Sequence, residues 1–480
     1  MLFPSSKKMK IEVPAFLGGM NGSVDENVLS LAQAKEVVNF DVSGGALRAG
    51  LGLSELDFGG CQNFKQRLAE VGNILWVCQF RRMKQDGARG DFLICLSEAG
   101  DLVAVDIVSD QPNKTIWTGI EEVPVAVNYN LESEDVVIFC GKNFPMIVWN
   151  GVDDAYSVAD APQVTSMVVH YERLFATASG AEKNSVWFSD DLDPTNWTLS
   201  LLEAGFVQMV DERGASNKVL SFLDYVYVFR EYGIARISGY GDQTQFLVSQ
   251  LSTSSGKIFP NTVTLCGDVV LFLAEDGIYS FNGLSTTKIL PAFTSFFEGV
   301  DNTDAVATAG DGKWFLSAKM WLENADGIRV LTPVVLEYDL NKKKVCVGTG
   351  LGVVCLAPLR TEQGSKVLAV AEHNGTKTVY EIDHSGAVLG ESLSGVWKST
   401  WSDLSCPQMQ KMVRRIALYT KNWATVTIET DSQKQVVDFY GDRHPDYRMV
   451  AVRGTRMRFV IEANAKDAEI SGFVAELFLR

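Results

Sequence analysis

The chain has 480 residues, of which 46% are hydrophobic and 21% charged. This is ordinary globular composition, with room for one large domain and one small one. The formal net charge of −16 argues against a protein that grips a nucleic-acid backbone, although an acidic wall would let a duplex slide past without sticking. No run approaches the ~20 apolar residues that cross a bilayer, and no apolar segment follows the N-terminal lysines, so we expect neither membrane insertion nor export.

We expect residues 1–58 to form an extended assembly segment that closes onto the domain after it. Within this segment, the spacing of Leu29, Leu31, Ala34 and Val37 weakly indicates a helix over residues 24–39. Residues 39–48 are predicted to form two short strands, because the Ser-Gly-Gly sequence at 43–45 favours a tight turn between them.

From residue 59 to 392 a strand-like phrase recurs about seven times. Each copy is an apolar run between turn residues, and the copies lie at 101–107, 146–152, 185–190, 233–239, 277–283, 335–340 and 378–383. A second apolar run precedes five of them, at 134–140, 224–230, 267–274, 312–318 and 364–370. A period of roughly 40–50 residues built from strands is typical of propeller blades. The sequence therefore predicts an all-β fold with a β-propeller of six or seven blades, with a large sandwich or two unrelated β-domains as the alternative.

Residues 393–480 are predicted to form a separate β-sandwich. Six strand candidates lie at 414–419, 424–429, 435–440, 448–453, 456–462 and 472–479, and several alternate apolar and polar residues as half-exposed antiparallel strands do. Seven arginines gather here: Arg414, Arg415, Arg443, Arg448, Arg453, Arg456 and Arg458. They are either strand-edge charges that block aggregation or a basic face that docks an acidic partner.

Residues 189–197 resemble the aspartate box of sialidase-type propellers, which reads roughly Ser-x-Asp-x-Gly-x-x-Trp. Asp193 stands where the box has Gly, and Trp197 comes one residue late. The box stabilises a hairpin turn, so we expect Asx-type hydrogen bonds with Trp197 packed beneath them. A glycosidase is an alternative, but it would need a tyrosine nucleophile, an acidic partner and clustered arginines.

No other pattern predicts catalysis, a metal or a cofactor. The acidic pairs Asp153–Asp154 and Asp190–Asp191 could hold a structural cation, although turn chemistry is the simpler account. The four histidines are not at metal-ligand spacing and are expected to be isolated. The eight cysteines form no Cys-x-x-Cys pair, so we expect buried free thiols made in a reducing cytoplasm.

Several segments resemble the tail nozzle, or packaged-DNA stabilisation, proteins of short-tailed phages. Near the N-terminus the resemblance lies in residues 16–21 and in Asn39-Phe-Asp-Val-Ser-Gly-Gly-Ala-Leu-Arg48 with the following residues 49–52. In the middle of the chain it lies in residues 172–177, 186–190, 193–197 and 269–280. Residues 414–479 look like the C-terminal domain of these proteins. The chain departs from the pattern at Gly50, where the family commonly has a second arginine.

The resemblance implies a structural virion protein that is not an enzyme and needs no cofactor. Copies would form a ring, a hexamer rather than a dodecamer, below the portal and its adaptor. The ring would contact other tail proteins, close the DNA channel, retain the genome and let double-stranded DNA pass without sequence recognition. It would assemble in the host cytoplasm, with Asp153, Asp154, Asp190 and Asp191 as possible channel-facing residues. The alternative is a receptor- or glycan-binding propeller at the tail tip.

Overall fold

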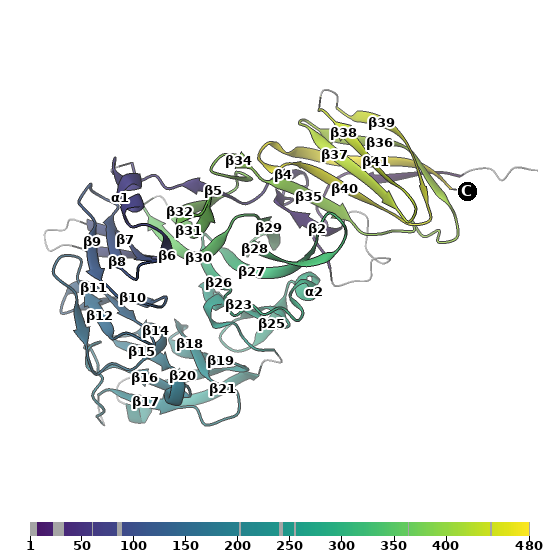
Figure 1. Cartoon of the computed structure of the whole chain (residues 1–480). Coiled ribbons are helices and arrows are strands. Elements are labelled where there is room, and N and C mark those ends of the chain that lie inside the picture. The colour runs from purple at the N-terminus through teal and green to yellow at the C-terminus, as the bar shows by residue number, and fades with distance from the viewer. Residues whose placement is uncertain are drawn as a thin grey trace, which may run out of the picture.

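The computed structural model describes residues 7–22, 33–59, 61–83, 89–200, 203–239, 243–253, 256–362, 364–441 and 444–479. In these residues the strands form seven propeller blades and a neighbouring pair of sheets, which confirms the all-β propeller and sandwich predicted from the sequence. Figure 1 shows the propeller blades around a common axis at the left and the sandwich at the right.

Each of the first six blades is an antiparallel sheet of four strands in chain order. Blade one contains β6 (Ile74–Met83), β7 (Arg89–Ser97), β8 (Leu102–Asp106) and β9 (Lys114–Trp117). Blade two contains β10 (Val125–Leu131), β11 (Glu134–Cys140), β12 (Met146–Trp149) and β13 (Tyr156–Val158). Blade three contains β14 (Val164–His170), β15 (Arg173–Ala178), β16 (Ser185–Phe188) and β17 (Gly205–Gln208). Blade four contains β18 (Ser216–Phe222), β19 (Tyr225–Arg230), β20 (Gly233–Ser238) and β21 (Leu247–Thr253). Blade five contains β22 (Thr264–Cys266), β23 (Val269–Ala274), β24 (Gly277–Phe281) and β25 (Thr286–Ile289). Blade six contains β26 (Val306–Gly310), β27 (Lys313–Glu323), β28 (Arg329–Asp339) and β29 (Lys344–Thr349).

Blade seven is built from both ends of the propeller sequence. β30 (Val353–Thr361), β31 (Gly364–His373) and β32 (Thr376–Asp383) supply three strands, and β5 (Gly52–Glu55) pairs with β32 as the fourth. The short strands β33 (Ala387–Val388) and β34 (Glu391–Ser392) extend this sheet. The pairing of β5 with β32 therefore closes the ring of blades by joining its start to its end.

The seven repeated phrases in the sequence are the third strands of the seven blades, and the runs before them are second strands. These middle strands are buried because each blade packs against a neighbouring blade on both of its faces. For example, Phe80 of blade one and Trp149 of blade two belong to one hydrophobic cluster between these two blades. The first strands of neighbouring blades contact one another, so they lie innermost around the axis.

The sandwich takes strands from both ends of the chain. One sheet contains β3 (Phe40–Asp41), β4 (Leu47–Ala49), β41 (Glu469–Leu479), β36 (Lys411–Thr420) and β39 (Asp446–Gly454), with β1 (Lys7–Val13) also paired to β41. The other contains β2 (Ala34–Val38), β35 (Ser394–Ser399), β40 (Met457–Asn464), β37 (Ala424–Thr430) and β38 (Lys434–Phe439). Trp397, Phe459 and Phe473 are buried in a core that continues without a break into blades five and six.

The predicted helix over residues 24–39 is wrong where the structure describes it, because residues 34–38 form β2, which pairs with β35. Residues 24–32 of that prediction lie outside the described residues. The two short strands predicted within 39–48 are confirmed as β3 and β4, with Phe40 opposite Ala49. The turn between them has Gly45 at φ +82°, a conformation that glycine adopts without strain.

Helices are short in the described ranges. The α-helices are α1 (Phe64–Glu70) and α2 (Thr294–Phe297), and 3₁₀ segments span Gly180–Glu182, Gln243–Gln245, Pro260–Thr262, Pro291–Phe293 and Ala465–Asp467. None of the described helices is long and apolar enough to cross a membrane.

Candidate functional site

Asp153 and Asp154 lie in the loop between the third and fourth strands of blade two. Asn150 organises this loop: its Oδ1 accepts hydrogen bonds from the backbone N–H groups of Val152 and Asp153 at 3.0 and 2.9 Å. Its Nδ2 donates to the Asp153 carboxylate at 2.7 Å, and Lys114 Nζ lies 3.4 Å from Asp154. The contacts are those of an Asx turn with a neighbouring cation, as turn chemistry predicts.

Asp190 and Asp191 lie in the equivalent loop of blade three. Asn196 Nδ2 donates to the Asp190 carboxylate at 3.2 Å, and Asp191 lies 3.9 Å from Arg173 Nε. Because strands alternate in direction, the loops after third strands emerge on one face of the disc, outside the innermost strands. These acidic residues therefore share a face of the propeller, and Leu192, next to Asp191, lines a hollow with Asn128 and Val169 of the innermost strands. That the acidic residues face the channel of a ring stays a prediction.

The box-like turn that follows is stabilised as the sequence predicts. The Asp193 carboxylate accepts hydrogen bonds from the Thr195 backbone N–H at 2.9 Å and from its hydroxyl at 2.6 Å. Trp197 is buried and donates from its indole nitrogen to the Pro194 carbonyl at 3.0 Å. In the described part of the chain, no group of three His, Cys, Asp or Glu side chains could hold a metal ion.

The arginines of the sandwich do not form one face. Arg415 lies 2.6 Å from Glu476 and 4.9 Å from the ring centre of Tyr447, and its hydrogen bond holds the pKa of Glu476 below the usual range. Arg448 pairs with Asp446 and donates to the Asp438 carbonyl at 3.1 Å.

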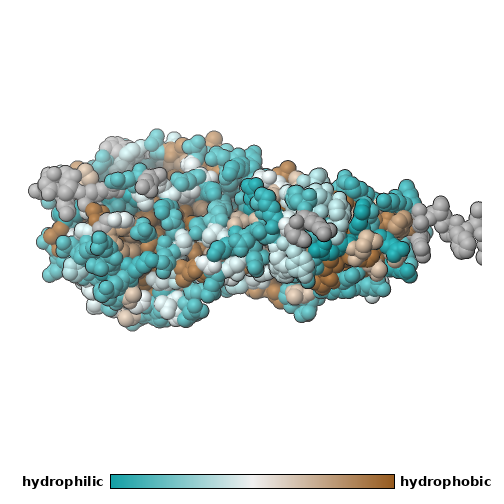
Figure 2. All heavy atoms as spheres, turned by 90° about the horizontal axis from the view of Figure 1, so that it is seen from above, coloured by the Kyte–Doolittle hydropathy of each residue, from teal (hydrophilic) through white to brown (hydrophobic). Residues whose placement is uncertain are grey.

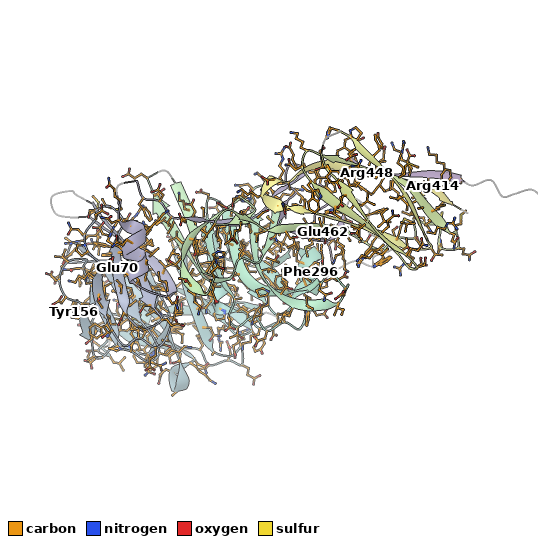
Figure 3. The ribbon with its side chains drawn as sticks, turned by 45° about the horizontal axis from the view of Figure 1, so that its top comes forward. Glu70, Tyr156, Phe296, Arg414, Arg448 and Glu462 are labelled. Atoms are coloured by element: carbon orange, nitrogen blue, oxygen red, sulfur yellow. The ribbon has the colours of Figure 1, made fainter. Side chains whose placement is uncertain are left out.

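Three further arginines, Arg414, Arg453 and Arg456, are exposed, whereas Arg443 lies outside the described residues. Figure 3 places Arg414 toward the end of the sandwich that points away from the propeller, Arg448 about midway along the sandwich, and Glu462 closer to the propeller.

Arg458 is buried at the junction of the two domains. It lies 2.5 Å from Glu429 of the sandwich and 2.8 Å from Glu323, at the end of β27 in blade six. Lys398 contacts Glu323 at 3.4 Å and the buried Glu36 at 3.1 Å. We call Glu36, Glu323, Lys398, Glu429 and Arg458 the junction cluster.

The junction cluster ties β2, β27, β35, β37 and β40 together. Glu36 Oε1 also accepts a hydrogen bond from the Glu323 backbone N–H at 2.6 Å, and burial raises the pKa of Glu36 although Lys398 opposes the shift. Lys434 lies 2.8 Å from Glu429, so acidic and basic groups balance across the network. A balanced, hydrogen-bonded network together with a continuous apolar core fixes the sandwich against the propeller.

Apolar side chains are exposed along one edge of the sandwich, where β38 and β39 each pair with a single strand. They are Val436, Tyr440, Tyr447 and Met449, and Met449 is 74% exposed. We call these four residues, with Arg415, Arg448 and Arg453, the sandwich edge. Figure 2 shows brown apolar patches on the sandwich as well as on the propeller. Exposed edge strands with apolar side chains mark sites of protein contact.

The two domains differ in charge. Residues 393–480 hold more basic than acidic residues, so the negative net charge of the chain comes from the rest, and chiefly from the propeller. The sandwich edge and the acidic propeller loops are therefore surfaces of opposite character on one rigid body.

Two histidines contact side chains that the sequence did not predict. His384 Nε2 lies 2.9 Å from Glu337, and His170 Nδ1 lies 2.9 Å from the Ser221 hydroxyl. Burial lowers the pKa of His170, so this imidazole is neutral at pH 7. The hollow beside His170 measures about 20 Å³, which is room for about one water molecule.

The cysteines are free thiols, as predicted, and most are buried. Burial raises the pKa of Cys95 to about 12 and that of Cys355 to about 11, which keeps these thiols protonated and unreactive at neutral pH.

No protein-family profile matches the sequence, and no curated protein matches it. Among solved structures, the chain is similar to two crystal structures of BBS1N in complex with ARL6DN, one soaked with mercury and one with lead. The first is 13% identical and covers 61% of this chain and 88% of that chain, with a TM-score of 0.35. The second is 10% identical and covers 65% of this chain and 97% of that chain, with a TM-score of 0.40. The assignment of the fold rests on the strand pairing described above, and these similarities carry no inference about function.

Proposed function

We propose that this chain is a structural virion protein of a tailed phage whose copies form a ring-shaped nozzle below the portal and its adaptor. The ring closes the DNA channel, retains the packaged genome and lets it pass at ejection. The resemblance of residues 39–52 and 414–479 to tail nozzle proteins supports the proposal. These segments, far apart in the sequence, meet in the sandwich, where Leu47 of β4 lies opposite Ile470 of β41.

The observation that carries the proposal is the presence of two unlike surfaces on one rigid body. The sandwich edge exposes apolar side chains beside three arginines, of which Arg415 and Arg448 are paired with carboxylates and Arg453 is exposed, whereas the propeller loops around Asp154 and Asp191 are acidic and exposed. Contact between the sandwich edge of one copy and the acidic propeller of the next would be head-to-tail. Such contacts form a closed ring when the rotation between copies closes.

Rigidity is the second requirement of a ring, because every copy must repeat the same rotation. The junction cluster and the continuous core hold the sandwich and the propeller at one angle. An acidic subunit also suits a channel wall, since it repels phosphate and lets DNA slide.

Self-association of the whole chain tests the proposed contact. We expect sedimentation velocity to detect oligomers at 50 mM salt that weaken at 500 mM salt. Met449→Asp should weaken them further, whereas Met449→Lys at the same exposed position should not, because the partner surface is acidic. Equal effects of the two variants would contradict the charge complementarity. A monomer or trimer with measurable sugar affinity on a glycan array would instead support the receptor-binding alternative.

A further inference from the structure

The innermost strands of the propeller contain no acidic residue. Within the bounds given above, β6, β10, β14, β18, β22, β26 and β30 hold neither Asp nor Glu, although the chain as a whole has 59 acidic and 43 basic residues. They do hold Arg81, Arg82, Lys218 and Arg360. Arg82 is neutralised by Glu134 at 3.1 Å. The first strands of this acidic protein therefore carry basic side chains and no acidic ones, and the carboxylates that compensate Arg81 and Arg82 come from the second strands, which hold Asp91 and Glu134.

Arg81 and Arg360 line the same hollow, which measures about 490 Å³ and lies where blades one, two and seven meet. Its remaining lining consists of Cys78, Gln79, Ala126, Asn128 and Pro358. Among the described residues, the exposed Arg360 guanidinium has neither a hydrogen bond nor an ion pair, and Arg81 Nη2 is buried without a hydrogen-bond partner. Arg360 thus brings exposed donors to this hollow, and Arg81, which also lines it, has buried donors on Nη2 that no hydrogen bond satisfies.

The hollow is held in shape by Gln79. Its side-chain Nε2 donates to the Arg360 carbonyl at 2.9 Å, and its Oε1 accepts from the Arg360 backbone N–H at 2.8 Å. This pair of hydrogen bonds joins the first strand of blade one to the first strand of blade seven. A ligand would therefore meet a wall that is already organised.

The carboxylates near the hollow determine how much of the positive charge of its arginines is left for a negatively charged ligand to balance. Asp91 lies 3.2 Å from Arg81 Nε and balances that guanidinium. Asp135 and Glu172 line an adjoining hollow that shares Arg81, and Asp135 accepts a hydrogen bond from the Met83 backbone N–H at 2.8 Å. The uncompensated positive charge is that of Arg360, on the side of blade seven.

We propose that this hollow binds a carboxylate group, with Arg360 and Arg81 Nη2 as donors and the Asn128 amide as a third. A single carboxylate balances the one uncompensated charge, and the fork of a guanidinium matches the two oxygens of a carboxylate. The carboxylate comes either from a free dicarboxylate or from an acidic peptide segment. This site goes beyond the proposed ring and does not depend on it.

Binding to the full-length protein tests the site. The probes are succinate, followed by saturation-transfer NMR, and a labelled hexaglutamate peptide, followed by fluorescence anisotropy; neutral succinamide is the matched control ligand. We expect one or both carboxylate probes to bind at 50 mM salt, and the probe that binds identifies the source of the carboxylate. Arg360→Gln should weaken binding at least about tenfold, the usual effect of losing one charged hydrogen-bonding partner, and Arg360→Glu should abolish it.

The control variant is Arg456→Gln, which removes an exposed arginine from the sandwich and should leave binding unchanged. Because Arg360 is exposed, neither of its variants is expected to affect folding, and thermal unfolding checks this. Absence of binding for both carboxylate probes would overturn the proposal. Equal binding to wild type and to Arg360→Glu, or an equal loss with Arg456→Gln, would overturn it as well.

Discussion

Removal of the Arg458 side chain should destabilise the sandwich and loosen its attachment to the propeller. In the Arg458→Ala variant, Glu323 and Glu429 lose the guanidinium that they share and keep only Lys398 and Lys434, respectively, as cationic partners. Breaking a buried ion pair by removing one partner costs 3–5 kcal/mol, and we expect about 3 kcal/mol because Glu323 remains one-fifth exposed. The loss should appear as a lower urea midpoint of the transition that involves the sandwich.

The assay is urea unfolding followed by tryptophan fluorescence, since Arg458 lies 5.0 Å from the ring centre of Trp401. Arg458→Met keeps most of the apolar stem and separates lost charge from lost packing. Arg456→Ala, two positions away and exposed, should change the free energy of unfolding by less than about 0.5 kcal/mol. A double-mutant cycle with Glu323→Ala should be non-additive by more than about 0.5 kcal/mol, because these residues come from different domains and touch. Unfolding of Arg458→Ala within about 0.5 kcal/mol of wild type would refute the structural role of the junction cluster.

Three further predictions concern stability and reactivity. Burial alone would raise the pKa of Glu429, but hydrogen bonds from Lys434 and Arg458 bring it below its ordinary 4.5. The ionised Glu429 therefore stabilises the folded protein fully above pH 4.5, and this stabilisation is lost as the pH falls through the lower pKa of the folded state. The difference in Tm between the wild type and Glu429→Gln should accordingly narrow below pH 4.5. A difference that widens there would contradict the direction of this pKa shift. Burial raises the pKa of Cys95 to about 12, so this thiol should resist alkylation by iodoacetamide at pH 8 in the native protein and react in urea. Peptide mass spectrometry measures the labelling, and equal labelling in the native and unfolded states would contradict the prediction. Leu53→Asp places a carboxylate at a buried position of β5, the strand that closes blade seven, and it should destabilise the protein by more than about 3 kcal/mol and expose the propeller to limited proteolysis. Protease resistance equal to that of the wild type would argue against closure of the ring by β5.

The sequence was sufficient to predict the blades because their middle strands are buried on both faces. The third strand β12, for example, is buried at all four positions, which produces an apolar run between turns. The pairing of β5 with β32 joins residues more than 300 positions apart, and local patterns carry no information on such a partner. The helix predicted near Val37 failed for a related reason: β2 is buried at four of its five positions, and such a run satisfies helical spacing as well as strand spacing.

The candidate surfaces were less predictable than the fold. Arg415 and Arg458 look equivalent in the sequence, yet one lies on the outer face of the sandwich and the other is buried at the junction. A bulge between Val413 and Arg415 interrupts the alternation of inward-facing and outward-facing side chains along β36. The two-residue period of a strand therefore could not show from the sequence which way Arg415 points. The contact of Glu36 with Lys398 spans 362 positions and gives no local signal. The absence of acidic residues from the innermost strands is visible in the sequence only after the strand boundaries are known.

The most direct test of the account is the assembly state of the full-length protein. Native mass measurement at several concentrations, with negative-stain images of any large species, should be made on the protein alone and after addition of a portal–adaptor complex. We predict closed rings of identical copies, six rather than twelve, formed alone or on the portal–adaptor complex. A protein that stays monomeric at every concentration, and also in the presence of those partners, would contradict the proposal that this chain is a ring-forming nozzle subunit.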